Sequence, residues 1–128
     1  MIFVVDKDTD LFVAAYSIFI KIFGTLSYSL FCAQNIAVCA DEDSVAKGFI
    51  GWKVYGGNNI EITNLAVVEA YRNIGVGTSL MNWIKEMYRG YVFSLNVSVH
   101  NYSAIRLYEK LGLPTVVEYT PEKEQVHL

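Results

Sequence analysis

The stretch 65-LAVVEAYRNIGVGTSLM-81 constrains the fold of this chain more than any other segment. It begins with apolar residues typical of a buried strand. Apolar residues at 76, 80, 83, 84 and 87 then follow the spacing of one helix face, which predicts a helix over 76–88. Gly75 and Gly77 fall at the junction, although glycine is among the poorest helix formers. The glycines therefore need an explanation at the start of the helix.

The residues before this stretch predict a meander of strands with helices inserted near its start. We expect strands at 1–5, 36–40, 46–56 and 60–68, and helices at 9–22 and 25–34. Turns as short as 56-GGNN-59 require antiparallel neighbours.

The residues after it predict a different pattern. We expect a strand at 91–99, a helix at 102–111 between an Asn101 cap and Gly112, and short strands at 115–119 and 124–128. The helix between 60–68 and 91–99 predicts a parallel pair there. The fold class is thus α/β (α+β), one domain over 1–128, with a mixed, mostly antiparallel central sheet of six to seven strands flanked by about four helices.

Composition excludes several classes of protein. The chain has 128 residues, 53% of them hydrophobic, which indicates a globular domain rather than a disordered one. The net charge is −3 and no run of Lys or Arg occurs, so we expect no nucleic-acid partner. Cys32 and Cys39 are too few for a disulfide scaffold, and we expect both to be reduced and buried in a cytoplasmic protein. His100 and His127 do not have metal-ligand spacing, so no metal is expected.

The apolar run 11–31 resembles a membrane span in composition. Lys21, Gly24 and the polar residues 27–29 interrupt it, and a span needs about 20 apolar residues with few charges. We therefore interpret the run as two core helices and expect no membrane partner. A membrane protein is the alternative that rests on this run alone.

The two glycines suit an anion-binding site. The first N–H groups of a helix lack internal partners and favour anions, phosphate above all. Gly75 and Gly77 would clear space for a phosphate and permit unusual backbone angles, while Arg72 would add a cation. Close packing of the helix on the sheet would also require small residues. A P-loop would need a Lys here, and a dinucleotide fingerprint would need a third glycine where Leu80 stands.

The pattern 72-RNIGVG-77 resembles the acetyl-CoA motif, Gln/Arg-x-x-Gly-x-Gly/Ala, of the GNAT superfamily of N-acetyltransferases. The segment 101-NYSAIRLYEKLG-112 resembles the second signature of that superfamily. The resemblance implies a V-shaped splay between strands 60–68 and 92–99, in which the strand edge at 65–67 pairs with pantetheine and the N–H groups of 72–77 hold the pyrophosphate. The cofactor-binding residues that it implies are Leu65, Ala66, Val67, Arg72, Asn73, Ile74, Gly75, Val76, Gly77, Thr78, Asn101 and Tyr108.

The same resemblance implies transfer of an acetyl group from acetyl-CoA, as co-substrate, to a primary amine that attacks the thioester directly. Tyr108 matches the tyrosine that protonates the departing thiolate, although the helix pattern alone would make it a core residue. Glu61 matches the general base of the histone-type members, and its alternative is a solvated strand carboxylate. The acceptor would be a protein N-terminus, a lysine or a small amine. A homodimer is also compatible with the superfamily.

The chain departs from the family pattern at three points. Asn96 stands where the ribosomal-protein N-acetyltransferases tend to carry Glu or His, Glu69 stands where Pro is usual, and the tail is short. Glu69 concerns the turn and not the chemistry. Asn96 and the short tail leave a non-catalytic acyl-CoA-binding or sensor module open as the alternative. The acidic turn 41-DEDS-44 would attract a cationic acceptor or would simply be solvated.

Overall fold

The computed structural model describes residues 1–23, 28–97 and 116–117. Along the chain the elements are β1 (Ile2–Val4), α1 (Asp10–Phe23), α2 (Tyr28–Cys32), β2 (Asn35–Ala40), β3 (Ala46–Tyr55), β4 (Asn59–Val67), a 3₁₀ turn η1 (Glu69–Tyr71), α3 (Val76–Met87), β5 (Val92–Val97) and β6 (Val116–Val117). The predicted helix at 102–111 and the predicted strand at 124–128 lie outside the described residues. The expected numbers of strands and helices therefore stay predictions.

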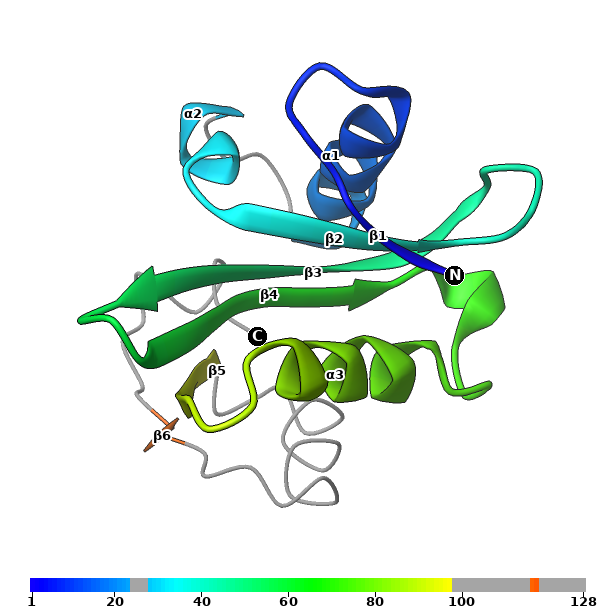
Figure 1. Cartoon of the computed structure of the whole chain (residues 1–128). Helices are drawn as coiled ribbons and strands as arrows, with labels where there is room; N and C mark the ends of the chain where they lie inside the picture. Colours follow the sequence, from blue (N-terminus) through cyan, green and yellow to red (C-terminus); the bar gives the residue numbers. More distant parts are fainter. Residues whose placement is uncertain (24–27, 98–115, 118–128) are drawn as a thin grey trace.

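The strands β1 to β5 form a mixed sheet in sequence order, and the short β6 follows β5 (Figure 1). Neighbours from β1 to β4 are antiparallel, whereas β4 and β5 are parallel. Helix α3 makes the crossover that a parallel pair requires. The α+β fold, the antiparallel meander and the parallel pair after it are thus confirmed.

A β-bulge interrupts β4 near its middle. The β3–β4 ladder shifts register between Gly51, which faces Asn64, and Trp52, which faces Ile62. Thr63 is therefore an extra residue on β4. An extra residue of this kind bends its strand and increases the local twist.

The β4–β5 ladder ends beside this bulge. Its last pair is Ile62 with Leu95, although β4 continues to Val67 and β5 to Val97. Within the part of the chain that the structure describes, the two strands do not pair again. This early end is what the predicted V-shaped splay between the strands requires.

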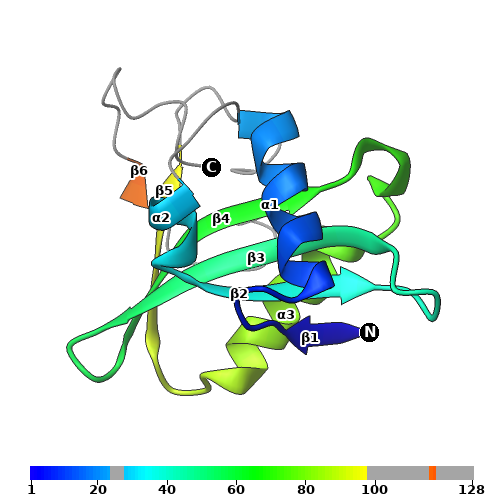
Figure 2. The same ribbon diagram turned by 90° about the horizontal axis from the view of Figure 1, so that it is seen from above.

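Helices cover the two faces of the sheet separately. Helices α1 and α2 lie on one face and α3 on the other (Figure 1), and the view from above shows α1 crossing the strands (Figure 2). The α3 face buries Ile50, Trp52, Ile60, Ile62, Leu65, Leu80, Met81 and Ile84, among others. The opposite face buries Phe12, Ala15, Phe19, Phe31, Ile36, Val38, Phe49 and Ala66, among others. Two cores, one per face, thus hold β4 between them.

Two details differ from the sequence predictions, one in α3 and one at the cysteines. Met87 is 55% exposed because it ends α3 beyond the core, whereas Met81, which the helical spacing omitted, is fully buried. Cys32 and Cys39 are free, as expected, but both are half-buried rather than buried. The described helices include none that is long and apolar enough to cross a membrane.

Candidate functional site

Among the described residues, one edge of β4 has no partner strand after the bulge. The Val68 N–H donates to the Lys47 carbonyl at 2.8 Å, so residue 68 points its backbone groups toward β3. Because these groups alternate along an antiparallel pair, Val67 and Leu65 point theirs toward the β5 side. The β4–β5 ladder has already ended there. The backbone of Leu65 is thus left free, among the described residues, to pair with an extended ligand.

The segment after β4 folds back onto this edge. Tyr71 N–H donates to the Val68 carbonyl at 2.8 Å, which forms the 3₁₀ turn η1. The Arg72 Nε–H then donates to the Val67 carbonyl at 3.1 Å. This bond satisfies the carbonyl of Val67 and places an exposed guanidinium beside the free edge.

Gly75 and Gly77 have different roles at the start of α3. Gly75 caps the helix with φ of 90°, a left-handed conformation that side chains disfavour. A Cβ added there would have no heavy atom of a described residue within 4 Å, so the space in front of Gly75 is open. Gly77 lies inside α3 and is absent from the residues with positive φ. The prediction of unusual backbone angles is therefore confirmed for Gly75 and wrong for Gly77.

The first turn of α3 leaves donors available beside Gly75. The first α-helical bond runs from the Ser79 N–H to the Gly75 carbonyl at 2.9 Å. The N–H groups of Val76, Gly77 and Thr78 precede it and have no acceptor within the helix. Asn73 also has positive φ, 64°, which turns the chain toward the helix. Free donors at a helix N-terminus favour an anion.

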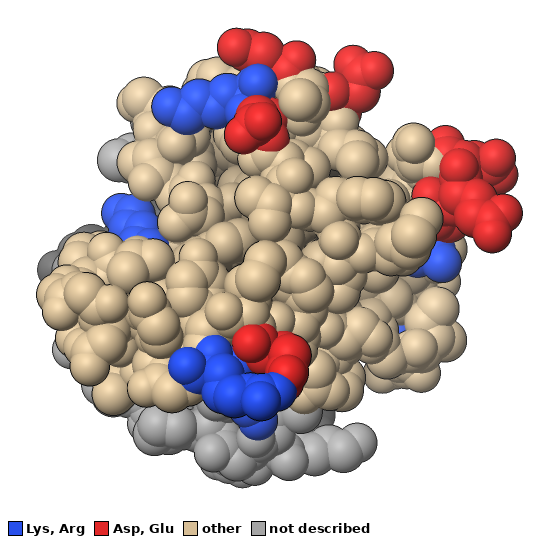
Figure 3. Space-filling model, viewed as in Figure 1, with Lys and Arg blue, Asp and Glu red and all other residues tan. Residues whose placement is uncertain are grey.

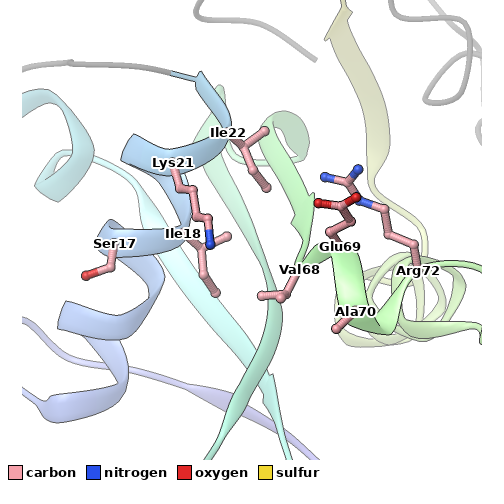
Figure 4. A pocket seen from close by; sticks show the side chains of 8 residues that line it. All are labelled: Ser17, Ile18, Lys21, Ile22, Val68, Glu69, Ala70 and Arg72. Atoms are coloured by element: carbon pink, nitrogen blue, oxygen red, sulfur yellow. The ribbon is translucent and has the colours of Figure 1, made fainter.

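A pocket of about 890 Å³ lies between this segment and α1 (Figure 4). One wall is the segment after β4, including Val68, Glu69 and Arg72, and the other is the last part of α1, including Ile18, Lys21 and Ile22. Each wall of the pocket thus has apolar side chains and a cation, and the wall after β4 also has the Glu69 carboxylate (Figure 4). Sequence analysis missed the α1 wall, although Lys21 is the one charge within the apolar run of that helix.

Glu61 lies on β4 just before the bulge. It faces Lys53 on β3 and Ser94 on β5 and is half-buried. Its neighbours Ile60 and Ile62 both enter the α3 core, so the alternation of side chains places Glu61 on the α1/α2 face. A carboxylate therefore stands where the two strands begin to part.

Polar residues that sequence analysis missed surround this point. The Thr63 hydroxyl donates to Gln34 Oε1, which joins the bulge to the segment after α2. Asn64 is only 4% exposed, and no described residue forms a hydrogen bond with its side chain. The one signal in the sequence is the polar pair 63–64 inside the apolar run of β4.

Two of the predicted site residues lie outside the described residues, namely Tyr108 and Asn101. Asn96 lies on β5 past the last pair with β4, where it pairs with Val116 of β6. Among the residues that are described, no group of three or more His, Cys, Asp or Glu could hold a metal ion.

The acidic turn between β2 and β3 lies at the far end of β4 from Glu61. Figure 3 shows its acidic side chains gathered on one side of the molecule. The Asp41 carboxylate accepts the N–H groups of Asp43 and Val45, at 2.9 and 3.0 Å, so part of its charge holds the turn together. Gly48, which follows this turn, pairs with Val67. The turn therefore lies near the end of β4 rather than near the parting strands.

The family model described as acetyltransferase (GNAT) family matches residues 9–113. An N-alpha-acetyltransferase of Sulfurisphaera tokodaii is 42% identical over 59 residues, which cover 43% of this chain and 35% of that relative. The chain thus spans about a third of the length of this curated relative. The match that carries the family is that of the family model over residues 9–113.

Solved structures share the fold at low identity. A tetramutant of BH1408 from Bacillus halodurans superposes with a TM-score of 0.74 at 17% identity, covering 94% of this chain and 97% of that one. The ribosomal-protein-S18-alanine N-acetyltransferase of Escherichia coli superposes with a TM-score of 0.70 at 23% identity, covering 88% and 77%. At these identities the likeness concerns the fold.

Proposed function

The chain belongs to the GNAT family of acetyltransferases, and from this premise we propose that it transfers an acetyl group from acetyl-CoA to a primary amine. The observation that carries the proposal is the free edge of β4, which leads directly into the open N-terminus of α3. An extended amide-containing arm can pair with the edge, while a phosphate binds the donors that follow.

The residues present suit two parts of acetyl-CoA, the pantetheine arm and the pyrophosphate. The Leu65 backbone offers an N–H and a carbonyl to the amides of pantetheine, and Ala66 and Val67 continue this strand. The N–H groups of Val76 to Thr78, the open space at Gly75 and the Arg72 guanidinium suit the pyrophosphate. Lys21 on the facing wall of the pocket adds a second cation. Asn73 and Ile74 form the bend that brings these groups together.

The chemistry needs a neutral amine, because an ammonium ion has no lone pair. We assign Glu61 the role of general base, through a water or directly, since it is half-buried where the strands part. The amine nitrogen forms a bond to the thioester carbon, the carbon–sulfur bond breaks, and the thiolate leaves. Tyr108 is the proposed donor of a proton to that thiolate, as the family signature implies.

The proposed acceptor is the α-amine of a protein N-terminus. Support comes from the relative named as an N-alpha-acetyltransferase and from the similar fold of the S18-alanine enzyme. A lysine side chain and a small amine are the competing acceptors. All three acceptors react through a primary amine, so an enzyme can select among them only through the groups that surround that amine.

A binding and turnover experiment tests the proposal. Acetyl-CoA at 100 times its dissociation constant should stabilise the fold by about 2.7 kcal/mol, measured as a rise in Tm. Adding peptides with free N-termini should then release a thiol, detected with a disulfide reagent. No Tm shift at millimolar acetyl-CoA would reject the proposal.

A sensor of acyl-CoA is the second candidate, and Asn96 favours it. An amide cannot accept a proton as a base, and Asn96 lies on β5 in the region where the strands part. A sensor would show the Tm shift without thiol release for any amine in a panel of peptides, lysine derivatives and small amines.

A further inference from the structure

The α1/α2 face of the sheet becomes polar where β4 leaves β5. Elsewhere this face buries aromatic and aliphatic side chains, such as Phe31, Phe49 and Ala66. Around the bulge it instead carries Glu61, Thr63 and Asn64, beside Gln34 from the segment after α2. Polar groups within an apolar face cost free energy unless they are hydrogen-bonded, so such a group needs an explanation.

Gln34 is held in place by two features. The Thr63 hydroxyl donates to its Oε1. Gly51, on the adjacent strand, provides the room: a Cβ added there would collide with Gln34 Oε1 and would lie 2.8 Å from Gln34 Cδ and 3.1 Å from Thr63 Oγ1. Any side chain at position 51 would thus displace the carboxamide.

This arrangement leaves the Nε2 end of the carboxamide available. Because Oε1 accepts from Thr63, the Nε2 group points its donors elsewhere. No described residue accepts a hydrogen bond from Gln34 Nε2. Gln34 is half-buried, so an N–H donor faces a partly dehydrated site.

Glu61 lies within reach of the same site. It precedes Thr63 by two residues on the same strand. A peptide N-terminus has its first carbonyl carbon two bonds from the amine nitrogen. One α-amine can therefore face Glu61 while its own carbonyl oxygen reaches Gln34. In a lysine side chain six bonds separate the amine nitrogen from the carbonyl carbon, so this two-point fit is lost.

We propose that Gln34, positioned by Thr63 over Gly51, donates a hydrogen bond to the first carbonyl oxygen of the acceptor. Gln34 thereby selects the α-amines of peptides over amines without an adjacent carbonyl. The proposal rests on the acetyl transfer proposed above, and it assigns the selection of the acceptor to a side chain outside both family motifs.

The test compares two acceptors that differ in one group. The first is a short peptide with a free N-terminus, and the second is the same peptide with its first amide replaced by a trans-alkene, which keeps the shape and removes the carbonyl together with the amide N–H. Gln34→Met keeps much of the side-chain volume and removes the donor. Asn35→Ala is the matched control, because it removes a neighbouring carboxamide that donates to the Trp52 carbonyl.

For the unmodified chain, we expect the alkene to lower kcat/KM about tenfold, the effect of one hydrogen bond in a partly buried site. Gln34→Met should lower kcat/KM about tenfold for the peptide and less than twofold for the alkene. Thr63→Val should also lower kcat/KM for the peptide more than for the alkene, because the hydroxyl that positions Gln34 is lost. Thr63→Ser keeps that hydroxyl and should keep the preference for the peptide. Asn35→Ala should keep this preference as well.

Equal losses for both acceptors in Gln34→Met would show a purely structural role and overturn the proposal. A Gln34→Met variant that keeps the kcat/KM of the unmodified chain for the peptide would overturn it as well. Both results leave acetyl transfer intact, because the unmodified chain still releases thiol. Absence of thiol release from the unmodified chain with every amine would instead overturn the proposed function, and the selection of the acceptor with it.

Discussion

The two halves of β4 differ in what they contact. Up to Ile62 the strand is paired on both sides, with β3 and with β5. From Leu65 onward it keeps β3, and no described residue of β5 pairs with it. The chain then turns through η1 to the left-handed Gly75. The bulge at Thr63 separates the halves. One strand thus carries a candidate base on its doubly paired half and a candidate cofactor edge on its singly paired half.

This difference shows how one extra residue can organise a site. A strand without the bulge would continue straight beside β5, and its edge would be occupied by ladder hydrogen bonds. The bulge bends β4 at the point where the reaction would occur. Chemistry and cofactor binding should therefore be separable by substitution, one half at a time.

Glu61→Gln should give the largest effect and should affect the first half only. If Glu61 is the general base, kcat should fall at least 100-fold, since the amide cannot accept the amine proton. The dissociation constant for acetyl-CoA should change less than twofold, because the edge at Leu65 is intact. Steady-state kinetics and calorimetry measure the two quantities.

Glu42→Gln is the control for this loss of one negative charge, because Glu42 is exposed in the β2–β3 turn. It should leave kcat unchanged. If Glu61→Gln kept full activity, Glu61 would be a solvated strand carboxylate, and the base would have to be sought elsewhere.

Sequence reasoning predicted the first half less well than the second. The second half has a local signature, because a strand, an arginine and two glycines in fixed spacing describe one continuous piece of backbone. The meander and its parallel crossover also follow from local turns and helix periods. Glu61 could be named only through the resemblance.

The polar site beside Glu61 could not be predicted, because it depends on contacts distant in sequence. Gln34 and Thr63 are 29 residues apart. The sequence does not distinguish Gly51 from any other glycine in a strand, because its role depends on the Gln34 carboxamide that occupies the space beside it. The bulge itself depends on the register with β3, and no residue type marks it. In the sequence, Lys21 only interrupts an apolar helix. Its place in the pocket wall that faces Arg72 depends on the fold.

Gly75→Val tests the entry into α3. A β-branched residue at φ of 90° should lower the free energy of unfolding by about 1–2 kcal/mol, measured by urea denaturation. Gly75→Asn is the matched variant and should lose clearly less, because Asn tolerates the left-handed region. Equal losses would show that backbone conformation is not what requires a glycine at this position.

Arg72→Ala tests the cation beside the free edge. It removes the bond to the Val67 carbonyl and a charge that we place near the pyrophosphate. Acetyl-CoA affinity should fall about tenfold, and less at high salt, since charge-assisted bonds to phosphate are screened. Arg89→Ala should leave affinity unchanged, because Arg89 pairs on the surface with Glu86. A similar loss in both variants would indicate an effect of net charge rather than of position.

Gly77→Ala should give the smallest effect, and its sign distinguishes the two glycines. Gly77 has helical conformation inside α3, where alanine is the better helix former. The free energy of unfolding should rise by up to about 1 kcal/mol, in contrast to the loss at Gly75. Acetyl-CoA affinity should stay within twofold, because the family motif accepts Gly or Ala here. A tenfold loss of affinity with a gain in stability would instead mean that even a methyl group at 77 obstructs the phosphate, and that clearance rather than conformation selects this glycine.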